Sequence, residues 1–188
     1  FFEAMRIIRS KRPRYIIFEN VKGLLSSNDG YDFILCLQEI ANAGYDGQWQ
    51  LLNTRWFLPQ NRERVFFVGH LRGQSQPKVF SFRKSTEKSN QKPKLLTKNL
   101  GQAQRVFSTN GVSVSIIALG GGQGAKTGLY EVKKGTQIRR LTPIECERLQ
   151  GFPDNWTEGL SDTQRYKCLG NAVTTNVIEW IGKQLYEC

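Results

Sequence analysis

The sequence has little that could bind a metal ion. Its 188 residues include one histidine, His70, and four cysteines. The cysteines, Cys36, Cys146, Cys168 and Cys188, form no C-x-x-C pair, and one histidine cannot complete a zinc site with them at any usual spacing. Their apolar or helical surroundings favour reduced, buried thiols and a cytosolic compartment over a disulfide framework. We therefore expect neither a metal nor a disulfide frame.

Long apolar runs are also missing. None reaches the length of a membrane span, and the start of the sequence shows no signal-peptide pattern. The opening segment, residues 1–5, resembles the middle of a helix, without an initiator methionine or a capping residue. We expect no membrane contact, and we expect that residues precede Phe1 in the natural protein.

Acidic residues are few compared with basic ones. Twenty-seven Lys and Arg against sixteen Asp and Glu give a formal net charge of +11. A polyanion is the natural partner of such a chain, and nucleic acid is the commonest polyanion. The charge alone does not establish nucleic-acid binding, because a basic surface can also simply keep a protein soluble. The hydrophobic fraction of 39% suits a folded chain with one compact domain and at most one small additional domain.

Helix and strand patterns alternate along the first 72 residues. Apolar spacing predicts helices over residues 2–8 and 33–41, ended by Pro13 and Gly44. Between them, Tyr15-Ile16-Ile17-Phe18 is a continuous apolar run, which is typical of a parallel strand buried on both faces. Two β-rich stretches follow at 49–57 and 64–68. This series predicts an α/β fold.

The composition changes after residue 72. Residues 73–98 are rich in Ser, Lys, Gln and Pro, and short β-prone pieces separated by glycines follow up to residue 138. Thr142-Pro143-Ile144-Glu145 then forms a helix start with a capping box, and Gly151 stops that helix after about Gln150. An apolar stripe over 172–185 predicts a terminal helix. We expect a small, mostly β domain at 73–138, flanked by two parts of one larger domain at 1–72 and 139–188.

Two short polar segments are candidates for a site. Glu19 and Asn20 follow the first predicted strand, where open α/β sheets bind ligands, although for this segment taken alone a turn with a solvated glutamate is favoured, because strand ends are often polar. Arg62 and Arg64 point the same way in an extended segment and could present paired donors to a base or a phosphate. An exposed charged hairpin is the alternative.

Taken in order, four segments closely resemble the later conserved blocks of the DNA (cytosine-5) methyltransferases. They are Phe18-Glu19-Asn20-Val21, Pro59-Gln60-Asn61-Arg62-Glu63-Arg64-Val65, the stretch from Arg140 to Pro153, and Gly170-Asn171-Ala172-Val173. The family keeps its target-recognition domain between the second and third blocks, where the composition changes here. The resemblance implies the C-terminal part of a Rossmann-like, S-adenosylmethionine-dependent methyltransferase sheet, with a small, mostly β target-recognition domain.

The resemblance also implies roles for the matching residues. In the family, a cytosine is flipped out of the duplex, attacked at C6 by a cysteine thiolate and methylated at C5 by S-adenosylmethionine. Glu19 matches the glutamate that binds N3 and the exocyclic amine, and Arg64 matches the arginine that donates to O2. Arg62 and Gln60 would hold this pocket. The cofactor side would be lined by Asn171, Ala172 and Val173.

Two segments of the predicted recognition domain resemble the recognition loops of small bacterial enzymes that methylate short GC-rich sites. Arg105 is the candidate reader of a guanine, and Gln102 would fill the gap left by the flipped base. Ser115 stands where the family usually has threonine and would keep the hydroxyl for a phosphate contact. The glycines Gly120, Gly121 and Gly122 would let the backbone approach DNA closely. With Gln60, these residues form the expected DNA-binding set.

Two blocks of the family are missing from this sequence. There is no Pro-Cys dipeptide to supply the nucleophile and no F-x-G-x-G segment to hold the cofactor, and both belong to the first half of the family. We expect part of a bacterial, cytoplasmic enzyme that acts on double-stranded DNA, is inactive alone, and depends on an N-terminal half in the same or a separate polypeptide. One alternative is a noncatalytic DNA-binding or regulatory module of the same fold. Another is an unrelated basic α/β protein that contacts RNA.

Overall fold

The computed structural model describes residues 1–73, 79–80, 91–97, 104–118, 128–133 and 137–186, and these form two units. The first unit comprises residues 1–52, 63–82 and 181–188, and the second comprises 53–62 and 83–180. Within the described ranges, no helix is long and apolar enough to cross a membrane. The division into domains that the composition predicts stays a prediction.

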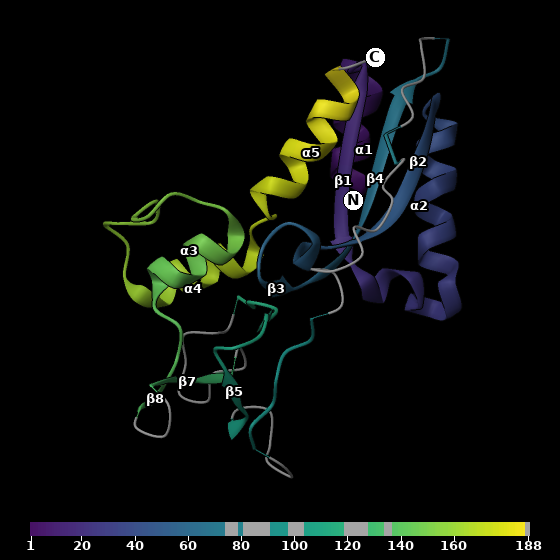
Figure 1. Ribbon diagram of the computed structural model, residues 1–188. Coiled ribbons are helices and arrows are strands. Elements are labelled where there is room, and N and C mark those ends of the chain that lie inside the picture. Colours follow the sequence, from purple (N-terminus) through teal and green to yellow (C-terminus); the bar gives the residue numbers. More distant parts are fainter. Residues whose placement is uncertain (74–78, 81–90, 98–103, 119–127, 134–136, 187–188) are drawn as a thin grey trace. The chain divides into compact units, whose positions relative to one another are not determined.

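The first unit is a three-stranded sheet with helices (Figure 1). The strands lie in the order β1-β4-β2, so the last of them in the sequence is the central one. Two short 3-10 turns, Lys22–Leu25 and Ser27–Gly30, lead from β1 into α2. The other elements are α1 (Phe2–Lys11), β1 (Tyr15–Val21), α2 (Tyr31–Asn42), β2 (Tyr45–Asn53) and β4 (Glu63–Leu71).

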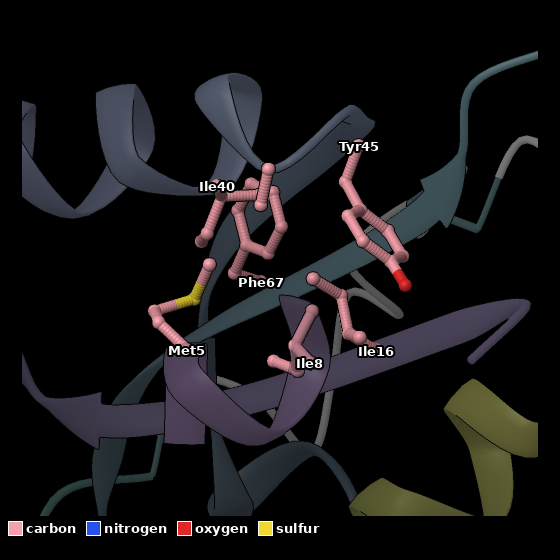
Figure 2. Packing of buried hydrophobic residues seen from close by; sticks show 7 residues of the cluster. Met5, Ile8, Ile16, Ile40, Tyr45 and Phe67 are labelled. Atoms are coloured by element: carbon pink, nitrogen blue, oxygen red, sulfur yellow. The ribbon is translucent and has the colours of Figure 1, made fainter. Parts of the chain in front are cut away.

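A compact apolar core joins both helices to the sheet, as Figure 2 shows. Met5 of α1 and Ile40 of α2 pack with Ile16 of β1 and Phe67 of β4. The hydroxyl of Tyr45 donates a hydrogen bond of 2.6 Å to the carbonyl of Pro13, so its one polar atom is satisfied. The two helices that the apolar spacing predicts are confirmed, and Met5, Ile8, Leu37 and Ile40 are the apolar positions that they contribute to this core.

The expectation of a parallel first strand buried on both faces is wrong. Strand β1 runs antiparallel to β4, and its side chains alternate, with Ile16 5% exposed and Ile17 40% exposed. The strand that is buried continuously is β4, in which every residue from Val65 to His70 is buried. Within this chain β4 has a paired strand on each side, whereas β1 pairs with β4 alone, and a strand between two others is covered more completely. β1 also continues to Val21, so Glu19 lies within the strand.

The second unit has short strands and three helical segments (Figure 1). Strands β3 (Gln60–Asn61) and β6 (Ser113–Val114) pair in parallel. A separate sheet has the order β5-β7-β8. Its strands are β5 (Val106–Ser108), β7 (Leu129–Lys133) and β8 (Gln137–Arg139), and the other elements of the unit are a 3-10 turn at Thr54–Trp56, α3 (Pro143–Gln150), α4 (Asp162–Asn171) and the first half of α5 (Thr175–Tyr186).

The start of α3 has the local structure that the sequence predicts. The hydroxyl of Thr142 accepts from the backbone N–H of Glu145, and the Glu145 carboxylate accepts from the backbone N–H of Thr142 at 2.7 Å. Gly151 ends the helix in the left-handed region with φ of 80°. Helix α4 was not predicted, because only its C-terminal end, with Leu169 and Gly170, is buried and most of its residues are polar.

Candidate functional site

Glu19 and Arg64 form an ion pair on one face of the β1–β4 pair. Glu19 Oε1 lies 2.9 Å from Arg64 Nε, and the two side chains are 23% and 17% exposed. The register places Arg64 opposite Val21, two residues from Glu19, so the two side chains are diagonal neighbours on the same face. The structure therefore brings together the two residues expected to bind the base.

The surroundings of this pair restrict how Arg64 can move. One terminal nitrogen, Nη1, donates a hydrogen bond of 2.7 Å to the backbone carbonyl of Glu63. Burial lowers the pKa of Arg64, and the charge and hydrogen bond of Glu19 oppose that shift. Arginine nevertheless stays charged at neutral pH, because its ordinary pKa is so high. The pair is thus a fixed, half-buried donor and acceptor set that is still reachable from solvent.

An apolar cavity adjoins β1 in the same unit. Its volume is about 250 Å³, and it lies between β1, α1 and α2. Glu19 and Asn20 contribute to its wall together with aromatic and aliphatic side chains such as Phe18, Phe33 and Leu37. Concave apolar space beside a few convergent polar groups is typical of small-molecule sites.

Arg62 belongs to the second unit, where it is 3% exposed and joins three segments of the chain. Its Nη1 donates to Ser115 Oγ at 3.2 Å and to the carbonyl of Ile116 at 2.7 Å. Its Nη2 donates to the carbonyls of Gly170 and Ala172 at 3.1 and 3.0 Å. Acceptors of the protein surround the guanidinium, and its hydrogen bonds hold the segment at Ser115 and Ile116 beside the segment at Gly170 and Ala172.

Gln60 and Gln150 form a second buried connection, and both side chains are 0% exposed. The Gln60 amide donates to the carbonyl of Leu149 at 2.8 Å and accepts from the N–H of Ile116 at 3.1 Å. Gln150 donates to the carbonyl of Leu169 at 2.7 Å and accepts from the Thr174 hydroxyl at 2.9 Å. Gln60 has no exposed atom to offer to DNA here, so the geometry supports a positioning role, and its direct contact with DNA stays a prediction.

The segment expected to line the cofactor, Asn171, Ala172 and Val173, joins α4 to α5. Asn171 is exposed, whereas Ala172 and Val173 are half-buried. The preceding Gly170 is packed so closely that an added Cβ would lie 2.2 Å from the backbone nitrogen of Ala118. The glycine of this block is therefore required for a close backbone approach.

The predicted DNA-reading residues are placed in part. Arg105 is exposed immediately before β5, and its backbone carbonyl accepts from the N–H of Leu129 at 2.9 Å. Ser115 is half-buried beside Arg62. Gln102, Gly120, Gly121 and Gly122 lie outside the described residues. Roles in DNA binding remain predictions for all of them.

The sequence patterns did not indicate the buried carboxylate that the structure shows in α3. Glu147 is 0% exposed, and one of its oxygens lies 2.9 Å from Arg165 Nη2. It also accepts from the N–H groups of Asn155 and Thr157 at 2.7 and 3.0 Å, and from the Thr157 hydroxyl. Burial alone would raise the pKa of Glu147, but these donors lower it. Its spacing from Glu145, which caps the same helix, predicted no shared site, because residues two apart in a helix face different directions.

The charged groups described above can donate and accept hydrogen bonds in recognition. Across the described part of the chain, no three His, Cys, Asp or Glu side chains cluster as metal ligands would. Cys146 is buried, and burial raises the pKa of its thiol to about 12, so it is a poor nucleophile. Cys36 lies at the apolar cavity, and burial raises its pKa as well.

Comparison with known proteins gives the same assignment along the whole chain. The sequence matches the family described as C-5 cytosine-specific DNA methylase over residues 1–117 and 117–187. It is 31% identical to the type II methyltransferase M.HhaI of Haemophilus parahaemolyticus, covering 96% of this chain and 65% of that protein. For M.DsaV of Dactylococcopsis salina the identity is 28%, covering 98% of this chain and 60% of that protein. The chain thus spans less than two thirds of these relatives.

Solved structures share the fold. The Dnmt2 methyltransferase of S. pombe superimposes with a TM-score of 0.69 at 19% identity, covering 93% of this chain and 65% of that one. A mutant of DNMT2 from Spodoptera frugiperda gives a TM-score of 0.72 at 17% identity, covering 99% and 71%. The α/β methyltransferase fold is therefore confirmed, and the chain belongs to the C-5 cytosine-specific DNA methylase family.

Proposed function

We propose that this chain is the base-recognition part of an enzyme that methylates cytosine at C5 in double-stranded DNA. The observation that carries the proposal is the ion pair of 2.9 Å between Glu19 and Arg64. Its two members are the residues that match the family's base-binding glutamate and arginine, and they come from separate strands to one half-buried place. The family match supports cytosine as the base.

In this proposal, Glu19 and Arg64 bind opposite parts of one cytosine edge. Glu19 accepts from the exocyclic amine and shares a proton with N3, while unused N–H groups of Arg64 donate to O2. When a thiolate adds at C6, the π electron pair of the C5–C6 double bond moves to C5 and is shared with N3 and O2, so negative charge builds at those atoms. Donors fixed at those atoms stabilise that charge and leave C5 nucleophilic. After methylation, a base takes the C5 proton, the electrons of that C–H bond re-form the C5–C6 double bond, and the thiolate leaves C6, which restores the aromatic ring.

Two contributions must come from another part of the enzyme. No Pro-Cys dipeptide occurs in this sequence, and Cys146 is too deeply buried to act. We assign the thiolate and most of the cofactor site to an N-terminal half in the same or a separate polypeptide. The chain spans 65% of M.HhaI and 60% of M.DsaV, and the remainder of each relative is long enough to include such a segment.

The methyl donor of this family is S-adenosylmethionine, which supplies an electrophilic methyl group when bound. The residues present fit one edge of its site. Asn171 offers an exposed amide, and the backbone of Ala172 is fixed by Arg62 and by Gln150. We propose that Arg62 and Gln60 act as positioning residues, because they hold this edge and the segment at Ser115 and Ile116 in place.

We assign DNA binding to the basic chain as a whole, and in particular to the predicted recognition domain at residues 73–138. Arg105 is exposed and suited to donate two hydrogen bonds to a guanine in the major groove. The excess of eleven positive charges would add contacts to phosphates that do not depend on sequence. The relatives named as type II methyltransferases come from bacteria, and we propose a short duplex site and the bacterial cytoplasm for this chain as well.

The proposal is tested by methyl transfer from labelled S-adenosylmethionine to duplex DNA. The chain is assayed alone, and then with the polypeptide encoded immediately upstream. Transfer in the mixture and none with either part alone would support the proposal. If both parts fold and assemble but transfer nothing, while the chain still binds duplex DNA, the noncatalytic DNA-binding module is the better assignment.

A further inference from the structure

The loop between α3 and α4 exposes large apolar side chains in a way that the proposed function does not use. Trp156 is 65% exposed and Leu160 is 49% exposed. The ring of Trp156 stacks on Phe152, with 5.8 Å between the centroids and 21° between the planes. Aromatic side chains presented together on a surface are characteristic of places where partners bind, and tryptophan contributes more than most residues to such interfaces.

This loop is held from beneath by a fully buried carboxylate. Glu147 receives the backbone N–H groups of Asn155 and Thr157, which stand on either side of Trp156. Arg165 of α4 closes the same site with an ion pair of 2.9 Å. A charge buried this completely is stable only when its acceptors are satisfied, so these contacts fix the backbone on both sides of Trp156.

A second ion pair fixes the first part of the loop. Arg148 Nε and Nη2 lie 2.8 and 2.5 Å from the two oxygens of Asp154. Both anchors come from α3, one from its buried side and one from its exposed side. A loop prepared in this way loses little conformational entropy when it binds, which favours association.

The charge of the loop indicates what it binds. Residues 152–162 contain Asp154, Glu158 and Asp162 and no lysine or arginine, in a chain whose net charge is +11. All three carboxylates are on exposed residues, and since Asp154 is already paired with Arg148, Glu158 and Asp162 carry the negative charge of this surface. Phosphates of DNA would be repelled here, whereas a positively charged protein segment would be attracted. An arginine or lysine of such a segment could also lie over the face of Trp156.

We propose that the loop 152–162 is a docking surface for a basic segment of a partner protein. Trp156 and Leu160 would contact apolar side chains or side-chain stems of that segment, and Glu158 and Asp162 would pair with its cations. The surface lies wholly within the second unit, and its use does not require methyl transfer. The proposal therefore stands or falls separately from the proposed function.

The test uses the full chain labelled with ¹⁵N and two synthetic peptides. One peptide is built of arginine, lysine and leucine, and the other has glutamate in place of each cation. The indole N–H resonances of the four tryptophans report the place of binding. The basic peptide is expected to shift the Trp156 resonance most, with binding weakened by salt, and the acidic peptide is expected to shift none.

Two pairs of matched variants locate the surface. Trp156→Ala and Glu158→Lys are each expected to weaken binding of the basic peptide about fivefold to thirtyfold. Their controls are Trp49→Ala, which removes another exposed tryptophan (45% exposed), and Glu3→Lys, which makes the same charge change on α1; each should alter binding less than about twofold. Equal weakening by Glu158→Lys and Glu3→Lys would reduce the effect to bulk charge and overturn the proposal. It would also be overturned by an unshifted Trp156 resonance, or by duplex DNA shifting that resonance more than the peptide does.

Discussion

Arg64 reaches Glu19 diagonally across two antiparallel strands, with Nε 2.9 Å from Oε1, because it stands opposite Val21 and not opposite Glu19 itself. The diagonal contact leaves each residue with further hydrogen-bonding capacity, since a carboxylate has two oxygens and a guanidinium has five N–H donors. The pair can thus hold its own geometry while it contacts a third group.

Replacing Arg64 with alanine should separate base capture from DNA binding. In the assembled enzyme, Arg64→Ala removes the charged donor to cytosine O2, so kcat/KM should fall by about one to two orders of magnitude. Affinity for the duplex should change little, because the phosphate contacts lie elsewhere. Methyl transfer and an electrophoretic binding assay, run on the same preparation, measure the two quantities. An equal loss of both would argue against a role in the base pocket.

Arg105 should read one guanine of the target. Arg105→Ala is expected to relax discrimination at a single position of the site, at a cost of roughly 1 to 3 kcal/mol for the correct sequence. Competition binding with duplexes that differ at one base pair measures the change. Uniform weakening across all duplexes would make Arg105 a phosphate contact.

Arg62 should matter for stability, because its buried guanidinium donates to two segments of the second unit. Arg62→Ala removes four side-chain hydrogen bonds to buried or half-buried groups together with a large buried side chain, and should lower the free energy of unfolding by roughly 3 to 5 kcal/mol. The matched control is Arg6→Ala, whose side chain is 71% exposed in an ion pair with Glu3, and which should cost less than about 1 kcal/mol. Urea denaturation of both variants makes the comparison. Similar losses for the two variants would show that the hydrogen bonds of Arg62 contribute no more to the free energy of unfolding than an exposed ion pair does.

Two helical glycines should respond in opposite directions to alanine. Gly170→Ala drives a methyl group into the backbone at Ile117 and Ala118 and should destabilise the protein by roughly 1 to 3 kcal/mol. An added Cβ at Gly182 in α5 meets nothing within 4 Å, so Gly182→Ala should stabilise by about 0.5 to 1 kcal/mol through helix propensity. Thermal unfolding followed by circular dichroism gives both signs. A stabilising Gly170→Ala would contradict the close approach described above.

The Arg139–Glu145 pair should make stability depend on pH below neutrality. The hydrogen bond from Arg139 lowers the pKa of Glu145 to about 2, from its ordinary value of 4.5. A carboxylate with a depressed pKa stabilises the fold above its unfolded value, and that contribution disappears as pH falls from 4.5 toward 2. The difference in unfolding free energy between the natural chain and Glu145→Gln should therefore shrink over this interval. A difference that stays constant from pH 6 to pH 2 would exclude this linkage; Glu3→Gln serves as the control.

The sequence predicted those features of the fold that arise from local patterns. The helix that starts at Thr142 was placed correctly, because a capping box and a C-terminal glycine are local signals. The orientation of β1 was predicted wrongly, because it depends on which strand lies beside β1, and β4 enters the sheet only after some forty further residues. A run of apolar residues does not indicate which strand, distant in the sequence, will pair with it.

The candidate site was predicted unevenly for the same reason. Glu19 and Arg64 were found through block resemblance, and the structure adds that they form an ion pair. Glu147 carried no signal in the sequence, because its importance lies in a buried site shared with Thr157 and Arg165, and nothing in the spacing distinguishes it from an exposed helical glutamate. Gln60 was expected both to hold the pocket and to contact DNA; its full burial supports the positioning role, and the DNA contact stays a prediction.

The most direct test of the central claim is nucleoside analysis of DNA after reaction with the assembled enzyme. Duplex DNA is incubated with S-adenosylmethionine and the chain together with its upstream polypeptide, digested, and analysed by mass spectrometry. The account predicts 5-methyldeoxycytidine with the natural chain and a strong loss of it with Glu19→Gln or Arg64→Ala. Undiminished 5-methyldeoxycytidine with both variants, or methylation on a different base, would contradict it.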